Sequence, residues 1–191
     1  MKPRMTVVAG PSGSGKSTLF AVAGLAPDAF NVDDRAARAH GSYAGIPPEI
    51  RTQAQRECED FVANCIERQR SFAVESTLRS DAALRQAVTA RAAGFATFLI
   101  FVCAGSVDEH LRRVALRGRL GGHSAPETEL RDIYVRSLGH LTAARGLFDE
   151  ANLYDSSERW GLPRCVVQLR TEGVRELPPV PEWVPATWRT A

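Results

Sequence analysis

The stretch Gly10-Pro11-Ser12-Gly13-Ser14-Gly15-Lys16-Ser17 lies between the apolar run Met5-Thr6-Val7-Val8-Ala9 and a segment typical of a helix. Its spacing, G-x-x-x-x-G-K-[ST], is that of a phosphate-binding loop placed between a strand and a helix. In such a loop successive backbone N–H groups point at an anion, and the helix adds its positive N-terminal end. A Gly/Ser turn that matches by chance would not need both flanking elements. The stretch therefore predicts a nucleotide site.

The residue types of this loop indicate which ligands it binds. Lys16 can neutralise the β- and γ-phosphates of ATP during catalysis, and the Ser17 hydroxyl can ligate Mg²⁺. We therefore predict ATP and Mg²⁺ as cofactors. The residues expected to contact the nucleotide are Gly10, Pro11, Ser12, Gly13, Ser14, Gly15, Lys16, Ser17 and Thr18.

Length and composition favour one ordinary globular domain over residues 1–191. The chain has 191 residues, of which 44% are hydrophobic and 24% are charged, enough for one sizeable core. No apolar run approaches the ~18 residues of a membrane span, and the first strand begins too early for a signal peptide. A net charge of +2 argues against nucleic acid as the main partner. We expect a cytoplasmic protein with neither a nucleic-acid nor a membrane partner.

Strand and helix patterns alternate along the chain. Strands are predicted over residues 29–32, 71–74, 95–102, 151–154 and 164–169, and helices over 16 to about 24, 49–70, 80–93, 106 to about 118, and from 124 onward. Residues 35–48 read as a broken helix followed by a loop, and the Pro-rich residues 178–191 as an extended surface tail. The alternation predicts an α/β fold of the P-loop, kinase-like class, a parallel sheet with helices on both faces.

The segment of about residues 106–146 is predicted to be a helical, arginine-rich lid. Two capping boxes, Ser106-Val107-Asp108-Glu109 and Ser124-Ala125-Pro126-Glu127, open its helices, and Gly121-Gly122 lies between them. Arginines that close on a transferring phosphoryl group can contribute ~10³ to 10⁵ in rate. Arg119 and Arg131, nearest the glycine pair, are the predicted lid arginines. Arg112, Arg113 and Arg145 are expected on solvated faces, paired with nearby acids.

Acidic residues follow two predicted strands on the side of the loop. Asp33 comes after the strand over residues 29–32, and Glu75 follows the strand over residues 71–74. Ligands bind at the carboxyl ends of parallel strands, and a kinase needs a carboxylate to take a proton from the acceptor hydroxyl. Asp33 and Glu75 are therefore candidates, whereas Asp34 is more easily explained as a helix cap or a surface acid.

Other classes of P-loop protein are disfavoured by missing motifs. The N-K-x-D and D-x-x-G strings of switch GTPases do not occur, and the apolar run that ends at Ala104 carries no Walker B aspartate. The kinase-like group remains.

Within that group the chain resembles the zeta-toxin-like P-loop kinases, from the loop to about Ser157. The strings that carry the resemblance are Asn31-Val32-Asp33, Glu75-Ser76-Thr77-Leu78, and Arg119-Leu120-Gly121-Gly122-His123 followed by Arg131 and Tyr134. The resemblance implies that Asp33 is the base, with Asn31 beside it at the substrate. It also implies that Glu75 and Thr77 lie at the sugar-phosphate and metal side, and that Arg119 and Arg131 bind the ATP phosphates. A further family glutamate falls near Glu59.

The best-known members of that family phosphorylate UDP-N-acetylglucosamine and are held inactive by a small helical antitoxin. This chain is shorter and reads Glu-Ser-Thr where they usually have Glu-Gly-Thr. The prediction is therefore an ATP-dependent phosphotransferase acting on a hydroxyl of a small metabolite, such as UDP-N-acetylglucosamine or another nucleotide sugar, with an antitoxin as an implied partner. Two alternatives stay open: an ATP-dependent regulatory module or ATPase without an acceptor, and a polynucleotide kinase.

Overall fold

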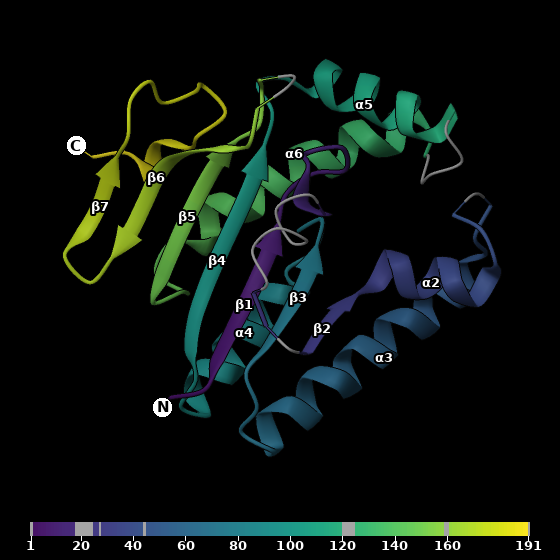
Figure 1. Ribbon diagram of the computed structural model, residues 1–191, viewed down its shortest axis with the longest axis horizontal. Helices are drawn as coiled ribbons and strands as arrows, with labels where there is room; N and C mark the ends of the chain where they lie inside the picture. Colours follow the sequence, from purple (N-terminus) through teal and green to yellow (C-terminus); the bar gives the residue numbers. More distant parts are fainter. Residues whose placement is uncertain are drawn as a thin grey trace.

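A computed structural model describes residues 2–17, 25–26, 28–43, 45–119, 125–158 and 161–190. Its centre is a seven-stranded sheet with the order β2-β3-β1-β4-β5-β6-β7 (Figure 1). The strands are β1 (Arg4–Ala9), β2 (Asp28–Asn31), β3 (Phe72–Ser76), β4 (Ala96–Cys103), β5 (Glu150–Asp155), β6 (Arg164–Arg170) and β7 (Gly173–Glu176). The apolar run predicted to be central is β4, with three strands on either side.

The sheet is mostly parallel, which confirms the predicted fold class, and one edge of it is antiparallel. Strands β1 to β5 pair in parallel, whereas β5, β6 and β7 pair antiparallel. No helix separates β5, β6 and β7 among the residues that the structure describes, and antiparallel neighbours need only a short connection. The sequence reading also missed β7, whose four residues are too short for a clear pattern.

The described helices are α2 (Val32–His40), α3 (Pro48–Glu67), α4 (Ala82–Ala92), α5 (Val107–Arg119) and α6 (Glu127–Ala144), with a 3₁₀ turn, η1 (Ala186–Trp188). The helix predicted from Lys16 to near Gly24 lies outside the described residues after Ser17, as does the glycine pair Gly121-Gly122.

Three helix starts differ from the predictions. Helix α2 begins directly after β2 because the Asn31 side chain accepts hydrogen bonds from the N–H groups of Asp33 and Asp34, at 3.0 and 3.2 Å. The predicted broken helix after residue 35 is therefore a continuous helix. Asp81 and not Ser80 precedes α4, and Pro126 is the N-cap of α6, neither with a side-chain cap bond.

One face of the sheet carries the main core. Side chains that alternate along β1, β3, β4 and β5 pack there against α3, α4 and α6, as the two-residue period of strands requires. Cys58, Cys65 and Cys103 are buried and free in this core, whereas Cys165 is only partly buried.

The C-terminal segment belongs to this core, so the predicted surface tail is a further correction. Trp188 is 0% exposed, and its indole N–H donates to the Leu141 carbonyl at 2.8 Å. The Trp183 ring lies against Phe101 at a centroid distance of 6.0 Å. Indole rings bury large apolar areas, and this outweighs the extended preference of the prolines around them.

Candidate active site

The loop over residues 10–17 connects the carboxyl end of β1 to the start of a helix at Lys16 (Figure 1). Gly10, Gly13 and Gly15 have φ angles of 140°, 81° and 93°, which L side chains rarely adopt. A Cβ on Gly10 would lie 2.0 Å from the Val102 carbonyl oxygen, and one on Gly13 would lie 2.8 Å from that of His110. Two of the three glycines are therefore required by close backbone packing as well as by φ.

The Lys16 side chain folds back on the first residues of this loop and is only 7% exposed. Its ammonium donates to the carbonyl oxygens of Gly10 at 2.8 Å and Pro11 at 3.0 Å. An ammonium has three N–H donors, so these two bonds leave one for an anion. Burial lowers the pKa of Lys16, while the carboxylates of Glu75 and Asp33 act in the opposite direction.

Among the carboxylates that act on Lys16, Glu75 has the largest electrostatic effect. It lies in β3 beside Val8 of β1 and Asn31 of β2 in the strand register, and so within the strand rather than after it as predicted. Burial raises the pKa of Glu75, the Lys16 ammonium lowers it, and Asp34 and Asp33 raise it further. The charge of Lys16 thus affects the pKa of Glu75, and the charge of Glu75 affects the pKa of Lys16, in a partly buried site.

Asp33 and Asp34 lie in the first turn of α2 and not at a strand end, but they still face the loop. Asp33 is 3.9 Å from the Arg51 guanidinium of α3. The Asp34 carboxylate accepts a hydrogen bond from the Tyr43 hydroxyl at 2.6 Å, and this bond raises the pKa of Tyr43. Asp34 therefore already has a partner, whereas Asp33 has a long contact to one guanidinium.

Two clefts meet at these groups. The first, the loop cleft, is lined by the loop and by Asp34, Tyr43, Arg113 and Arg117. The second, the β3 cleft, lies between the loop, β3, α3 and α4, and includes Arg51, Gln55 and Arg79. Both clefts share the residues Ser12, Lys16, Asn31, Asp33, Glu75 and Thr77. A ligand in one cleft is therefore adjacent to a ligand in the other.

The structure brings most of the predicted site residues together. The clefts are lined by Asn31, Asp33, Glu75 and Thr77 and, from the loop, by Ser12, Gly13, Gly15, Lys16 and Ser17. Gly10, Pro11 and Ser14 line neither cleft, and Thr18 lies outside the described residues. Glu59 does not line either cleft. It lies on the exposed side of α3 in a separate groove against α4. The structure therefore does not place Glu59 at the substrate cleft, where the resemblance predicted a glutamate. Gln55, one helical turn earlier, does reach the β3 cleft.

The arginines of α5 and α6 lie differently from the prediction. Arg131 is bound by Glu127 at 2.8 Å and Asp108 at 2.9 Å, and Arg119 is an exposed residue at the end of α5. Neither lines one of the two clefts as described, whereas Arg113 and Arg117 line the loop cleft. His110 and Val114 are the buried residues of α5. Positions 110, 113, 114 and 117 share one helix face.

The donors of the loop fit a polyphosphate. The Lys16 ammonium is next to the loop, and no atom lies within 4 Å of the position of a Cβ at Gly15, so this part of the loop is open to a ligand. Among the described residues no three His, Cys, Asp or Glu side chains form a metal cage. Mg²⁺ does not need one, since it usually takes phosphate oxygens, waters and one or two side chains.

These features define the kinase-like class of P-loop protein, with a mostly parallel α/β sheet. A model of a protein family described as an AAA domain (AAA_33) matches residues 5–136, and the chain belongs to this family. A search of curated protein sequences gives no match.

Solved structures share the fold at low identity. A chain of the PezAT chromosomal toxin–antitoxin system of Streptococcus pneumoniae superposes with a TM-score of 0.64 at 16% identity, over 87% of this chain and 72% of that one. A putative kinase from Chloroflexus aurantiacus gives a TM-score of 0.56 at 20% identity, over 72% and 79%. A chain of the AvrRxo1-ORF1:-ORF2 complex with ATP gives 0.62 at 12% identity, over 92% and 60%.

The predicted resemblance to zeta-toxin-like kinases is confirmed at the level of the fold. A separate finding concerns membranes: no described helix is long and apolar enough to cross one.

Proposed function

We propose that this chain is an ATP- and Mg²⁺-dependent phosphotransferase that phosphorylates a hydroxyl of a small metabolite, with nucleotide sugars such as UDP-N-acetylglucosamine as the first candidates. The observation that carries the proposal is the meeting of two clefts at Lys16, Asp33 and Glu75. A donor site and an acceptor site have to be adjacent for direct transfer. The loop cleft takes the nucleotide, and the β3 cleft takes the acceptor.

The residues of the chain have separate tasks in this reaction. The acceptor oxygen attacks the γ-phosphorus, and the bond from that phosphorus to the oxygen of the departing ADP breaks. Asp33 takes the proton of the acceptor hydroxyl, while Lys16 and Arg117 offset the charge on the phosphates. Ser17 and Glu75 are the residues that would hold Mg²⁺, which would supply further neutralisation of the phosphate oxygens when bound.

Two relatives support this assignment by what is stated of them. One is described as a putative kinase, and another was determined with ATP. Both share less than a quarter of their residues with this chain, so the acceptor is taken from the cleft and from the resemblance in sequence.

The test is phosphorylated product from ATP across a panel of metabolites, with UDP-N-acetylglucosamine and a 5′-hydroxyl oligonucleotide included. We expect product with one class of small molecule, loss of ATP binding in Lys16→Ala, and a rate ~10² to 10⁴ lower in Asp33→Asn with unchanged ATP affinity. The matched control is Asp132→Asn, an exposed carboxylate of α6 paired with Arg136.

Other outcomes are equally specific. Product that forms as fast with Asp33→Asn as with wild type contradicts the base assignment. Slow ATP hydrolysis with no acceptor identifies the regulatory module instead, and turnover of the oligonucleotide at ~0.15 M salt identifies a polynucleotide kinase.

An antitoxin partner is part of the proposal. The PezAT structure comes from a toxin–antitoxin system, and the AvrRxo1 structure contains two proteins, ORF1 and ORF2. Both support a search for a small helical protein encoded next to this chain. Co-expression of the neighbouring reading frame should give a complex that survives gel filtration and blocks turnover; separate elution of the two proteins contradicts such a partner.

A further inference from the structure

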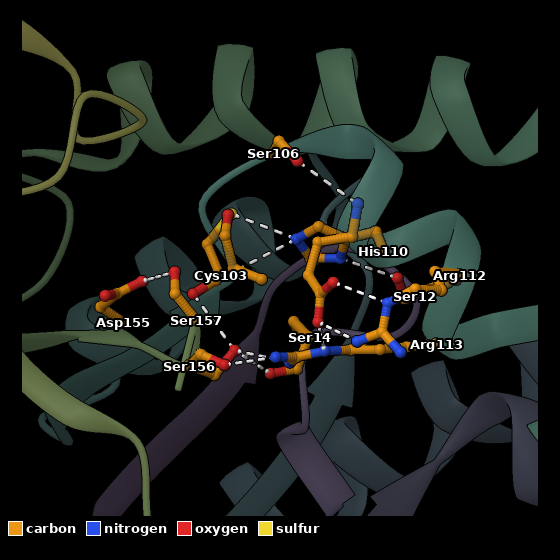
Figure 2. A network of polar contacts seen from close by, with 12 residues as sticks. Ser12, Ser14, Cys103, Ser106, His110, Arg112, Arg113, Asp155, Ser156 and Ser157 are labelled. Carbon is orange, nitrogen blue, oxygen red and sulfur yellow. Dashed lines mark hydrogen bonds and ion pairs between the residues drawn. The ribbon is translucent and has the colours of Figure 1, made fainter. Parts of the chain in front are cut away.

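Helix α5 contacts the back of the phosphate-binding loop through a buried histidine. The His110 ring accepts a hydrogen bond at Nε2 from the Ala104 N–H, at 3.0 Å, so Nδ1 carries the proton. That proton is donated to the Ser12 carbonyl oxygen at 2.9 Å (Figure 2). The ring is thus held in one tautomer between the end of β4 and the loop, 98 residues away in the sequence from its loop partner.

A second contact holds the loop two residues further on. The Ser156 hydroxyl donates to the Ser14 carbonyl at 2.8 Å. The Arg113 guanidinium in turn donates to the Ser156 carbonyl at 2.6 Å and to its hydroxyl at 3.2 Å (Figure 2). We call His110, Arg113 and Ser156 the loop-support cluster.

These bonds set the direction of the loop amides. A peptide unit is planar and trans, so its N–H points opposite to its C=O. With the Ser12 and Ser14 carbonyls fixed on the loop-support cluster, the N–H groups of Gly13 and Gly15 point away from it. Such N–H groups form the anion-binding concavity of a phosphate loop.

Close packing supports the same role for α5. A Cβ on Gly13 would lie 2.8 Å from the His110 carbonyl and 3.1 Å from Val114. The first half of α5 therefore lies directly on the loop, although the sequence assigned all of α5 to the predicted lid.

We infer that His110 is a positioning residue that holds the phosphate-binding loop in its anion-binding shape through the Nδ1–H bond to the Ser12 carbonyl, with Arg113 and Ser156 holding Ser14. The first half of α5 is then a fixed support of the loop and not part of a moving lid. The inference rests on the proposed function only for its effect on ATP, because the shape of the loop can be measured without nucleotide.

The surroundings of His110 keep it neutral. The charged and titratable groups that face it are the Lys16 ammonium, the Arg113 guanidinium and the Cys103 thiol, and the Tyr134 ring packs against it at 5.2 Å. Burial lowers the pKa of His110, and both cations lower it further, so one ring nitrogen stays an acceptor and the other a donor.

Two substitutions separate the two bonds of the ring. By bond count from Cβ, the amide nitrogen of His110→Asn falls near Nδ1 and keeps the donor to Ser12. The amide oxygen of His110→Gln falls near Nε2 and keeps the acceptor for Ala104. Both variants lose one buried bond of similar size, so a merely structural role predicts equal effects on the loop.

The readouts are ¹⁵N order parameters of the Gly13 and Gly15 amides in the nucleotide-free protein, and ATP affinity by calorimetry. We expect His110→Gln to lower the order parameters from rigid values to those of a flexible loop and to weaken ATP binding about tenfold. His110→Asn should keep both close to wild type. The control is His140→Gln in α6, whose Nδ1 contacts the Leu78 carbonyl at the same 2.9 Å and should leave ATP affinity unchanged.

Equal order parameters in wild type, His110→Asn and His110→Gln overturn the inference, as do equal losses in the two His110 variants. Absence of ATP binding by wild type overturns the proposed function and leaves the inference to the order parameters alone.

Discussion

At the scale of single residues, the loop over residues 10–17 depends on backbone shape more than on side chains. Gly10 has a φ of 140°, and a Cβ there would overlap the Val102 carbonyl oxygen at 2.0 Å. Gly94 has a φ of 90° as well, but no atom lies within 4 Å of its Cβ position. A side chain at Gly10 would meet both steric overlap and an unfavourable backbone conformation, whereas one at Gly94 would meet only the unfavourable conformation.

We predict that Gly10→Ala destabilises the chain by about 3 kcal/mol or more, whereas Gly94→Ala costs about 1 kcal/mol. The overlap at Gly10 is with backbone, which cannot rotate away as a side chain can. Urea denaturation measures both, and equal losses in the two variants contradict the assignment of Gly10 to close packing.

His110 gives a pH prediction at the same scale. Burial lowers its pKa from 6.5 to about 4, and Lys16 and Arg113 contribute to this shift. The unfolded chain takes up a proton as the pH falls below about 6.5, whereas the folded chain does so only near 4. This group therefore contributes a loss of stability that grows as the pH falls from about 6.5 to 4, reaching about 3 kcal/mol.

The measurement is the free energy of unfolding of wild type and His110→Asn across pH 4 to 7. The difference between the two should change across this window, because only wild type carries the buried imidazole. A constant difference contradicts the lowered pKa.

At the scale of elements, α5 and α6 differ in what their arginines can do. Arg117 of α5 lines the loop cleft and acts electrostatically on Lys16 and Glu75. Arg131 of α6 is 46% exposed and bound by two acids. Exposed ion pairs of this kind contribute little to stability.

We predict that Arg117→Ala lowers the rate of phosphoryl transfer by about 100-fold or more, since a cation at the phosphates acts mainly in the transition state. Arg136→Ala, which removes an exposed α6 arginine paired with Asp132, is the control. A larger loss in Arg131→Ala than in Arg117→Ala would restore the lid arginine predicted from the sequence.

The difference between α5 as predicted and as observed has a simple cause. The structure buries His110 and Val114 of α5, one polar and one apolar residue. A polar ring that is fully hydrogen-bonded can be buried like an apolar one, but the hydrophobic pattern by itself does not reveal its partners, Ser12 and Ala104. Arg113 and Arg117 share the helix face of His110 and Val114.

At the scale of the whole molecule, the C-terminal segment completes the core instead of lying on its surface. Trp188 packs beside α6, and Trp183 of the same segment lies against Phe101 of β4 and donates a hydrogen bond to Asp155 of β5 at 3.3 Å. The segment therefore contributes to the stability of the sheet that carries the loop cleft.

We expect Trp188→Ala to reduce the free energy of unfolding by about 3 to 5 kcal/mol, from lost burial and the cavity that remains. Leu162→Ala, at a side chain that is 72% exposed, should change it by less than about 0.5 kcal/mol. Thermal unfolding checks both. A loss below about 1 kcal/mol in Trp188→Ala would contradict the assignment of the C-terminal segment to the core.

The sequence by itself determined the features that depend on neighbouring residues. The loop motif, the strand before it, the buried run over residues 95–102 and the acids near the carboxyl ends of two strands were all readable, because local spacing fixes which groups share an edge of a parallel sheet. The kinase-like P-loop class followed from these.

Only the tertiary structure decided the features that depend on contacts between distant segments. The antiparallel edge, the buried tail, the place of Glu59 outside the clefts and the hydrogen bond from His110 to Ser12 each join parts of the chain that no local pattern connects. Burial and hydrogen bonding across such distances depend on the packed fold as a whole, so the loop could be recognised in the sequence while its support could not.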